Sequence, residues 1–550
     1  MRFPAGLIVG MMVLASIAGT VSGADEEDTC AVLFDFGNGR VMWADVPVTE
    51  GMNAFNVTVE AAYMVGLDLH HEEYALGPMI DSIGGVSNGQ TLNDPAWILS
   101  VWNSTSNSWE SASTGASYVS AIDFKAITWK YDLWGGPMPI ATPEHRYPWT
   151  SFRHDALNNG AMSDQKIDMA NFTLKWSKNL KNGGIQSSIA GANGHIYVVT
   201  RGVMNEDFTF ATDAKSSVFC LDASGNEVWR KNIGAGDYQA GSPLIHGGIL
   251  VVPSADGKLY AFDVADGAEK WTFNTGSGSS YGITSSPIAY LNNIIVAAGN
   301  GKLFSVDAAD GAENWNVTVS QVIYSSSPAI YDGVIYIGDD SGNVSAYAAD
   351  GSYLWSTPVG GKIRASPLVD ADNSRIVVTS GSSNGNITAL YLNNGTIQWQ
   401  TKIDVTSASV SLSSKGYIAA TAYDLIMVDF EGDKIWNCSL GETFGGGAPT
   451  VVGDMIFVVT NEASSRLVAI DLMGKVVKET TLTPANWAVH SPTFIDGILY
   501  VASDNGYIYA FSDIEDVKND NPWLLLGGLA AVIVIAAVGL VYWNGKRKGE

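Results

Sequence analysis

Three short clusters in this chain contain residue types that bind metals or phosphates. His70-His71-Glu72-Glu73 offers four potential metal ligands, but adjacent residues on a helix or strand point in different directions, so we interpret the run as a solvated loop. The segment 370–374 lacks the central glycine and the distant glutamate of a Ca²⁺ loop, which predicts a hairpin turn. The glycines 445–447 precede no Lys-Ser/Thr pair and therefore form no phosphate loop. The remaining histidines are scattered, and we predict no catalytic and no metal-binding residues.

The elements that would position any site repeat with a period of about forty residues from Gln186 to Phe511. The cleanest copy runs from Gly241 to Trp271 and consists of short β-branched and aromatic segments separated by Asp-Gly turns, whose glycines supply the positive φ that tight hairpins require. Eight units begin near Gln186, Gln239, Thr284, Ser325, Arg364, Ser407, Gly447 and His490. Each unit has the length of one four-stranded blade, so the sequence predicts an eight-bladed β-propeller.

The last unit stops after Phe511 and lacks an outer strand that ends in tryptophan. The segment Asn171 to Trp176, ahead of the first unit, has the missing pattern, so we expect it to pair into the last blade and close the ring. The outer strand of the seventh unit has Lys475-Val476-Val477-Lys478 and no tryptophan. The other units end in an indole that we expect to pack between neighbouring blades, at Trp176, Trp229, Trp271, Trp315, Trp355, Trp399 and Trp436.

Both ends of the chain predict export and membrane attachment. Residues 1–24 have the charge, the apolar run and the small residues of a signal peptide. The uncharged run Trp523 to Trp543 has the length of a transmembrane helix, and the basic residues 546–548 after it mark a cytoplasmic end. We therefore predict a single-pass cell-membrane protein with its ectodomain outside, a juxtamembrane linker at 514–522 and a cytoplasmic tail at 544–550.

The composition narrows the class of partner. The 550 residues include 30 Lys+Arg and 56 Asp+Glu, a formal net charge of −26, which disfavours nucleic acid as a partner. The three cysteines, Cys30, Cys220 and Cys438, are too few for a disulfide framework, and we favour unpaired thiols over a Cys220–Cys438 bridge without excluding the bridge. Glycosylation sequons, usable in a host with the machinery, stand at Asn56, Asn103, Asn171, Asn316, Asn343, Asn386, Asn394 and Asn437.

A separate domain precedes the propeller. The forty-residue period is absent from residues 25–135, and the proline-rich stretch 136–150 reads as a stiff linker to the propeller at 151–513. We predict a small β-rich α+β domain with strands at Ala31 to Phe36, Trp97 to Trp102 and Ala126 to Tyr131. The segment Ala54 to Val65 is ambiguous between helix and strand.

The repeats resemble those of the quinoprotein-type, or PQQ-like, propellers. The resemblance rests on copies of the pattern Leu259-Tyr260-Ala261-Phe262-Asp263 followed by Asp266-Gly267 and Glu269-Lys270-Trp271, and on the lead-in Trp149 to Asp155 with Asn159-Gly160 after it. It covers about Trp149 to Phe511. This family includes dehydrogenases that hold pyrroloquinoline quinone with Ca²⁺, and also cofactor-free propellers such as outer-membrane assembly scaffolds. The chain has no adjacent cysteine pair and no visible carboxylate and amide set for the ion, which favours the cofactor-free branch.

The N-terminal domain is similar to the C-terminal domain of transcobalamin and intrinsic factor. Three segments carry this resemblance: Met79 to Val86, Trp97 to Asn103 and Ile127 to Tyr131. The sequence departs from the family at Ser104, where a glycine is expected, and lacks the Gly-Asp pair before the last strand. The resemblance implies a corrinoid, or cobalamin-like, ligand as one option for this domain.

These observations predict a membrane-anchored extracellular scaffold whose non-catalytic propeller binds a protein, peptide or glycan without a cofactor. Two alternatives stay open. One is a quinone-dependent oxidoreductase that uses pyrroloquinoline quinone with Ca²⁺, and the other is a surface receptor that binds a small ligand such as a corrinoid through its N-terminal domain.

Overall fold

The computed structural model describes residues 29–514 except 38–39, 75–76, 92–93, 164, 279–281, 321, 382–384, 405, 441–446 and 485. Within this range the chain forms two compact units, an N-terminal unit and a unit that contains the propeller. The predicted signal peptide (1–24), transmembrane run, cytoplasmic tail and most of the juxtamembrane linker lie outside the described residues, and so does most of the glycine run 445–447.

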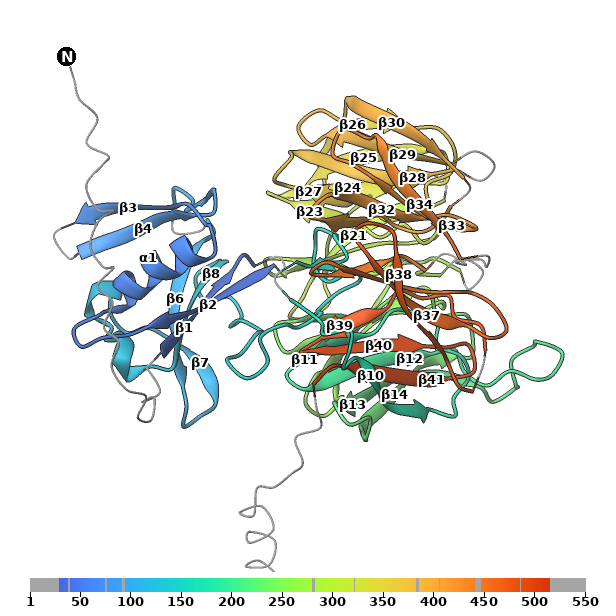
Figure 1. Cartoon of the computed structure of the whole chain (residues 1–550), viewed down its shortest axis with the longest axis horizontal. Coiled ribbons are helices and arrows are strands. Elements are labelled where there is room, and N and C mark those ends of the chain that lie inside the picture. Colours follow the sequence, from blue (N-terminus) through green and yellow to red (C-terminus); the bar gives the residue numbers. More distant parts are fainter. Residues whose placement is uncertain are drawn as a thin grey trace, which may run out of the picture. The chain divides into compact units, whose positions relative to one another are not determined.

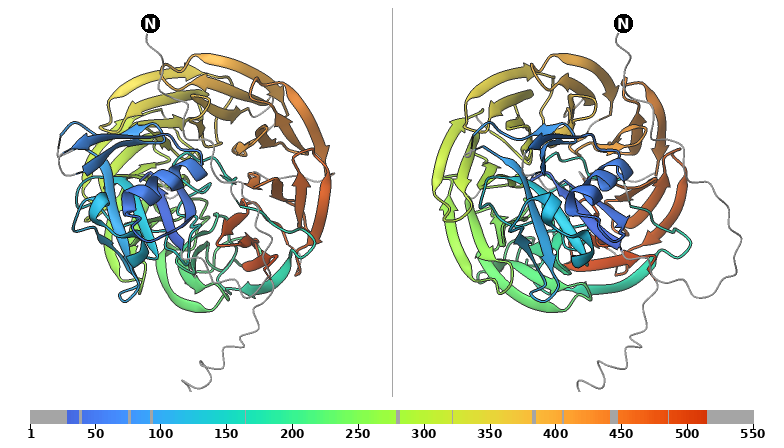
Figure 2. Two further views of the ribbon diagram at one scale, coloured as in Figure 1. Left: turned by 60° about the vertical axis from the view of Figure 1, so that its left-hand side comes forward. Right: turned by 90° about the vertical axis from the view of Figure 1, so that its left-hand side faces the viewer.

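Eight sheets, each with four antiparallel strands and one with a further short strand, make up the propeller (Figures 1 and 2). Numbered along the chain, the blades are built as follows: blade 1 from β11 (Ala190–Ala192), β12 (His195–Thr200), β13 (Lys215–Asp222) and β14 (Glu227–Ala235); blade 2 from β15 (Leu244–His246), β16 (Ile249–Pro253), β17 (Lys258–Asp263) and β18 (Glu269–Asn274); blade 3 from β19 (Ile288–Tyr290), β20 (Asn293–Ala297), β21 (Lys302–Asp307) and β22 (Glu313–Thr318); blade 4 from β23 (Ala329–Tyr331), β24 (Val334–Gly338), β25 (Asn343–Ala348) and β26 (Tyr353–Pro358). Blade 5 follows with β27 (Leu368–Asp370), β28 (Arg375–Ser380), β29 (Gly385–Tyr391) and β30 (Ile397–Ile403); blade 6 with β31 (Ser411–Ser413), β32 (Gly416–Ala420), β33 (Asp424–Val428) and β34 (Lys434–Ser439); blade 7 with β35 (Thr450–Val452), β36 (Met455–Val459), β37 (Arg466–Asp471) and β38 (Val476–Thr481); and blade 8 with β39 (Thr493–Ile495), β40 (Ile498–Ala502), β41 (Tyr507–Ser512) and β10 (Thr173–Asn179).

The strand patterns follow from each strand's place in the blade. The second and third strands are mostly buried because neighbouring blades cover both of their faces, as β24 and β25 show. Outer strands such as β26 alternate between exposed and half-buried residues, since only one of their faces meets a neighbouring blade. The hydrophobic core therefore lies between the blades and continues around the ring.

The ring closes by pairing the two ends of the propeller segment. Strand β10 runs antiparallel to β41, with Thr173 opposite Ser512 and Asn179 opposite Tyr507. This is the closure predicted from the tryptophan-bearing segment ahead of the first unit. Blade 7 gains a further short strand, β9 (Ala161–Met162), which pairs in parallel with β35.

Tryptophans join most blades to the next one. The indole Nε1 of Trp271 donates to the carbonyl of Ala308 at 2.9 Å, in the outer turn of blade 3. Gly311 in that turn has φ +73°, and a Cβ there would lie 2.7 Å from the indole ring. Glycine is therefore required both by the positive φ and by the close approach of the indole. Equivalent hydrogen bonds join Trp176 to Ala223, Trp229 to Val264, Trp315 to Ala349, Trp399 to Phe430 and Trp436 to Leu472. Trp355 packs against Gly395 of the next blade in the same way, and its buried Nε1 has no partner among the described residues.

Blade 7 uses a lysine where the other blades use tryptophan. Lys478 lies opposite Ala469 and donates its Nζ to the carbonyls of Met169 and Phe172, just ahead of β10. The reason lies in the closure, because the third and fourth strands of blade 8 come from opposite ends of the propeller segment. Blade 8 therefore has no outer turn with a glycine to receive an indole.

The N-terminal unit is an α+β fold. Its five-stranded sheet has the order β2 (Val41–Pro47), β1 (Thr29–Asp35), β8 (Ala126–Asp132), β6 (Ala96–Asn103) and β7 (Ser108–Ser111). The helix α1 (Ala54–Met64) resolves the ambiguous segment, because Asn53 and Asn56 form a capping box at its start. A smaller sheet contains β3 (Leu69–Tyr74), β4 (Gly77–Ile83) and β5 (Val86–Ser87), and two 3₁₀ turns, η1 (Ala116–Tyr118) and η2 (Ala121–Asp123), precede β8.

The predicted fold class, a β-propeller with a small β-rich domain and one C-terminal transmembrane helix, needs a correction. No helix in the part of the chain that the structure describes is long and apolar enough to cross a membrane. The α-helix α1 has 11 residues, whereas a bilayer requires about 20. The run Trp523 to Trp543 lies outside the described residues. Its apolar composition is compatible with a bilayer but does not show that the run forms a transmembrane helix. The fold class is therefore mainly β, and the predicted membrane contact and single-pass topology are unsupported.

Candidate functional site

A polar cavity of about 350 Å³ lies on the propeller axis. Its lining comes from the segments that lead into the inner strands, so it opens at the end of the ring where the fourth strand of one blade connects to the first strand of the next. Hydroxyl groups dominate this lining, and Phe152 contributes an aromatic ring. The repeat places one such segment per blade around the axis, which makes the cavity a product of the whole ring.

A belt of serines joins adjacent blades around this cavity. The backbone N–H of the serine in one blade, or of Ala448 in blade 7, donates to the Oγ of the equivalent serine in the next, at 2.8 to 3.0 Å. These donor–acceptor pairs are Ser188–Ser242, Ser242–Ser286, Ser286–Ser327, Ser327–Ser366, Ser366–Ser409 and Ala448–Ser491. Ala448 occupies the equivalent position in blade 7, so Ser409 meets no hydroxyl there. The serine belt thus uses the cavity wall to hold the blades in register.

The lead-in segment 147–162 runs along the inner strands of the ring, and its Phe152 reaches the cavity. Its main-chain carbonyls accept hydrogen bonds from the inner strands of six blades and from the turn after the inner strand of blade 8: Trp149 from Gly191, Thr150 from Ile245, Ala156 from Ile330, Leu157 from Val369, Asn159 from Leu412, Gly160 from Val451 and Tyr147 from Asp496. For blade 3 the contact is apolar, since Ala156 packs in one cluster with Ile288. The segment therefore ties the ring together from inside.

Arg153 and Asn158 anchor this segment. The fully buried Arg153 guanidinium donates to the carbonyls of Pro449 and Val410 and to Ser411 Oγ, at 2.6 to 2.7 Å. Burial lowers the pKa of Arg153 to about 9, partly opposed by Asp155. Asn158 Nδ2 donates to the carbonyls of Pro328 and Pro367. These carbonyls belong to the prolines, or their equivalents, that begin the inner strands.

Charged groups are few in the cavity lining. Arg364 stacks 4.7 Å from the Tyr324 ring and pairs with Asp340 at 3.1 Å. The buried His490 ring lies 2.9 Å from the Ser491 carbonyl at Nδ1, and the Ala502 N–H donates to its Nε2 at 2.6 Å. Burial lowers the pKa of His490, so the ring is neutral near pH 7.

The cavity lining does not fit a quinone with Ca²⁺. Calcium takes six to eight oxygen ligands with carboxylates among them, and the lining residues include no Asp or Glu. Among the described residues no group of three or more His, Cys, Asp or Glu side chains is placed to hold a metal ion. The structure thus offers no set of ligands here for the predicted alternative cofactor.

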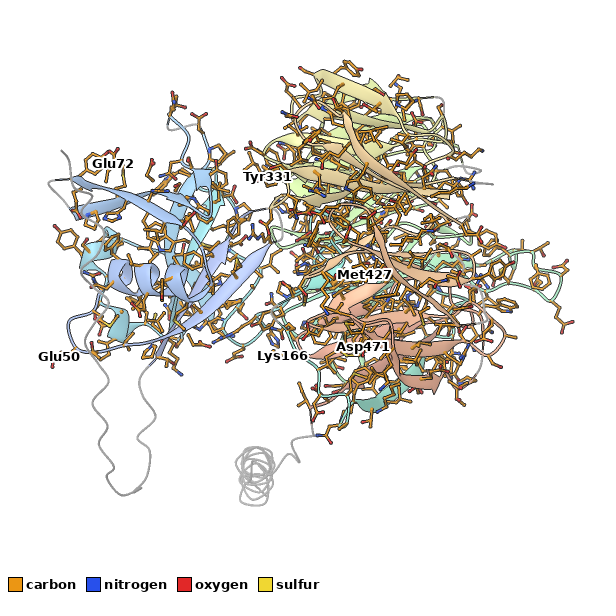
Figure 3. The ribbon with its side chains drawn as sticks, turned by 45° about the horizontal axis from the view of Figure 1, so that its top comes forward. Glu50, Glu72, Lys166, Tyr331, Met427 and Asp471 are labelled. Atoms are coloured by element: carbon orange, nitrogen blue, oxygen red, sulfur yellow. The ribbon has the colours of Figure 1, made fainter. Side chains whose placement is uncertain are left out.

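The residues singled out from the sequence do not converge. The run His70 to Glu73 lies in the exposed strand β3 (Figure 3 labels Glu72), so its interpretation as a loop was wrong. The run forms a strand because it pairs with β4, although its sequence has no hydrophobic alternation that would predict one. The segment 370–374 is a turn between β27 and β28, as predicted. The three cysteines are free thiols. Among the predicted glycosylation sites, Asn56, Asn171, Asn316, Asn394 and Asn437 are exposed and Asn103, Asn343 and Asn386 are half-buried.

Sequence reasoning missed the serine belt, the anchors Arg153 and Asn158, and a long loop at 201–214. The sequence contains a signal for the serine belt, since a serine precedes proline at the same point of five units. It also contains a signal for the loop 201–214, because the first unit is longer than the others. Arg153 and Asn158 had none beyond the lead-in pattern, since their partners lie about 170 to 300 residues away along the chain.

Comparisons of sequence place the repeats in a known family. The family profile described as outer membrane protein assembly factor BamB matches residues 165–326 and 321–513. The protein of that name from Salmonella typhimurium is 29% identical over 359 residues, which cover 62% of this chain and 88% of the relative. The Escherichia coli protein is 28% identical over 348 residues, covering 60% of this chain and 78% of the relative. These matches confirm the predicted PQQ-like repeats.

Solved structures share the fold. BamB from Moraxella catarrhalis superposes with a TM-score of 0.52 at 18% identity, covering 62% of this chain and 99% of that structure. Quinohemoprotein alcohol dehydrogenase from Comamonas testosteroni superposes with a TM-score of 0.53 at 15% identity, covering 67% of this chain and 81% of that structure. At these identities the likeness shows the propeller alone. The matched family segments begin at residue 165, so the transcobalamin-like N-terminal domain stays a prediction.

Proposed function

Because this chain belongs to the family of the outer membrane protein assembly factor BamB, we propose that it is an exported, non-catalytic propeller that binds other proteins. The relatives carry an assembly role in their name, and a protein-binding role is the part of it that a propeller can supply by itself. Export follows from the signal peptide that the first 24 residues predict.

One structural observation supports this proposal over an enzyme. The polar groups at the centre of the ring bind one another, since the serine belt and Arg153 hydrogen-bond to neighbouring blades and to the lead-in segment. An active site instead directs acid, base or metal-binding groups toward a substrate. The centre of this molecule is built to hold a rigid ring, and a rigid ring presents its surface loops in fixed positions for a partner.

The experiment is in-cell crosslinking of the tagged full-length chain with a short amine-reactive crosslinker, followed by denaturing purification and mass spectrometry. A few exported proteins crosslinked to the propeller are the expected result. Crosslinks only between copies of the chain itself, or to none, would refute the proposal.

Two other functions are tested in parallel by thermal unfolding. Pyrroloquinoline quinone with Ca²⁺, or cobalamin, at a hundred times its Kd would stabilise the folded chain by about 2.7 kcal/mol. We expect no shift with the quinone, because the cavity lining has no carboxylate. A shift with the quinone would make the chain an oxidoreductase candidate, and one with cobalamin would favour the predicted receptor role of the N-terminal domain.

A further inference from the structure

The loop 201–214 departs from the repeat. It joins β12 to β13, whereas the same connection has four residues in blades 2, 3 and 4, at 254–257, 298–301 and 339–342. Its conformation is fixed by main-chain hydrogen bonds from Asn205 to Thr209 at 2.7 Å and from Ala211 to Val203 at 3.1 Å. The loop projects from the ring (Figure 1). A long, ordered loop on a rigid repeat scaffold is where such proteins carry binding residues.

Phe208 at the tip of this loop costs stability. Its side chain is 82% exposed, and its backbone has φ +63°, a conformation that disfavours residues with a Cβ. Glycine or asparagine would satisfy this turn without strain, and a polar residue would avoid the exposed apolar surface. Neither packing among the residues that the structure describes nor the backbone conformation therefore explains the aromatic ring at position 208.

Phe208 belongs to a set of exposed apolar side chains at the cavity end of blades 8 and 1, which we call the blade 8/1 patch. Its exposed members are Val203, Phe208, Tyr238 and Trp487. Contacts join the loop 201–214 to the segment that carries Tyr238: Phe210 packs edge-on against Tyr238 at 5.5 Å, and Arg201 lies 5.7 Å from the Tyr238 ring. Arg201 pairs with Asp504 of blade 8 at 3.5 Å, and Asp504 N–H donates to the Trp487 carbonyl at 2.9 Å. Tyr238 also lines the central cavity, so the patch borders the cavity mouth.

The charge around the blade 8/1 patch is negative. The loop 201–214 carries the exposed carboxylates Glu206, Asp207 and Asp213, and its one cation, Arg201, is neutralised by Asp504. Hydrogen bonds from Thr209 lower the pKa of Asp207 and keep it ionised. An apolar surface rimmed by carboxylates attracts a partner that pairs apolar side chains with cationic ones.

From these contacts we infer that the blade 8/1 patch is a docking site for an exposed basic segment of a partner protein, one in which aromatic or large apolar residues stand next to Lys or Arg. This inference deepens the proposed protein-binding function by naming its surface and the chemistry of its partner. The apolar side chains pack on Phe208, Tyr238 and Trp487, and the cations meet Glu206 and Asp213.

The test is selection of 12-residue peptides from a random phage-displayed library on the immobilised full-length chain. Enriched sequences are expected to combine Phe, Trp, Tyr or Leu with Lys or Arg. A synthetic peptide of the top sequence should bind at least tenfold more weakly to Phe208→Ser, because a buried phenylalanine contributes about that factor. Glu206→Lys should also weaken binding, and added NaCl should weaken the wild-type complex.

Matched controls separate this inference from its alternatives. Met473→Ser removes an apolar side chain that is 69% exposed from the outer turn of blade 7 and should leave binding unchanged. Acidic enriched peptides, no enrichment over an uncoated surface, or equal binding to Phe208→Ser would overturn the inference. Displacement of phage by chitohexaose would instead make the patch a glycan site. If Phe208→Ser retains every in-cell crosslink of the wild type, the blade 8/1 patch is not the docking site, while the protein-binding function stands. If the wild type itself forms no crosslinks to other proteins, the protein-binding function is refuted.

Discussion

Single buried side chains join parts of the propeller that are far apart in sequence. Arg153 is the strongest case, because three hydrogen bonds from one guanidinium reach blades 6 and 7. Gly160 accommodates it, since a Cβ at Gly160 would lie 2.1 Å from the guanidinium. No local pattern predicts this arrangement: an arginine in a lead-in segment looks like a surface residue until the ring closes around it.

We expect Arg153→Met to destabilise the propeller by about 3 kcal/mol. Methionine fills similar volume, but the carbonyls of Pro449 and Val410 then lose a charged donor inside the protein. Thermal and urea unfolding measure the loss. Arg230→Met is the control: its ion pair with Glu227, at 4.0 Å on the surface, should be worth less than about 0.5 kcal/mol. Equal losses for the two variants would show that Arg153 does not anchor the ring.

His490 predicts a pH dependence. Burial lowers its pKa in the folded chain, whereas the unfolded chain titrates near 6.5. As the pH falls below about 6.5 the unfolded state takes up the proton first, so stability is lost, by at most about 2 kcal/mol at pH 5.0.

The measurement for His490 is the difference in unfolding free energy between wild type and His490→Gln at pH 7.5 and 5.0. Taking this difference cancels other groups, such as Asp496, whose burial raises its pKa and acts in the opposite direction. We expect the wild type to lose its advantage over the variant at pH 5.0. A constant difference would mean that His490 titrates normally.

At the scale of elements, much of the propeller was predictable because each blade repeats the same local signals. Asp-Gly turns, apolar runs and a final tryptophan predicted eight blades, and the segment before Trp176 predicted β10 and its pairing with β41. The strand β3 was not predictable, because its run His70 to Glu73 is polar on both faces and only pairing with β4 makes it a strand. The cavity also escaped prediction, since its wall needs all eight blades in place.

The joint between blades 7 and 8 gives a test of the closure. Lys478 occupies the tryptophan position and binds the carbonyls of Met169 and Phe172. Restoring the repeat consensus with Lys478→Trp should lower the stability, because blade 8 offers no turn glycine to receive the indole and the two carbonyls lose their donor. We expect a loss of about 1–3 kcal/mol by thermal unfolding. In contrast, Trp271→Lys should cost more than this, since it empties a complete joint, and a gain in stability from Lys478→Trp would contradict this account.

For the whole molecule, the net charge of −26 sets how salt acts. Like charges around the ring repel one another in the folded state, and the Debye length falls from about 30 Å at 0.01 M salt to about 3 Å at 1 M. The melting temperature at pH 7.5 should therefore rise by at least about 2 °C between these concentrations of NaCl.

Measuring the melting temperature near the isoelectric point isolates this effect of salt on stability. Salt has the opposite effect on the binding of a basic partner. At pH 4.5, which is the isoelectric point of the sequence, the net charge is close to zero and the increase with NaCl should disappear. Docking of a basic partner segment should instead weaken with NaCl at pH 7.5, because the same screening removes its attraction to Glu206 and Asp213. Salt thus stabilises the ring while it releases the partner, and an equal rise in melting temperature at both pH values would show that NaCl acts on this protein through something other than its charge.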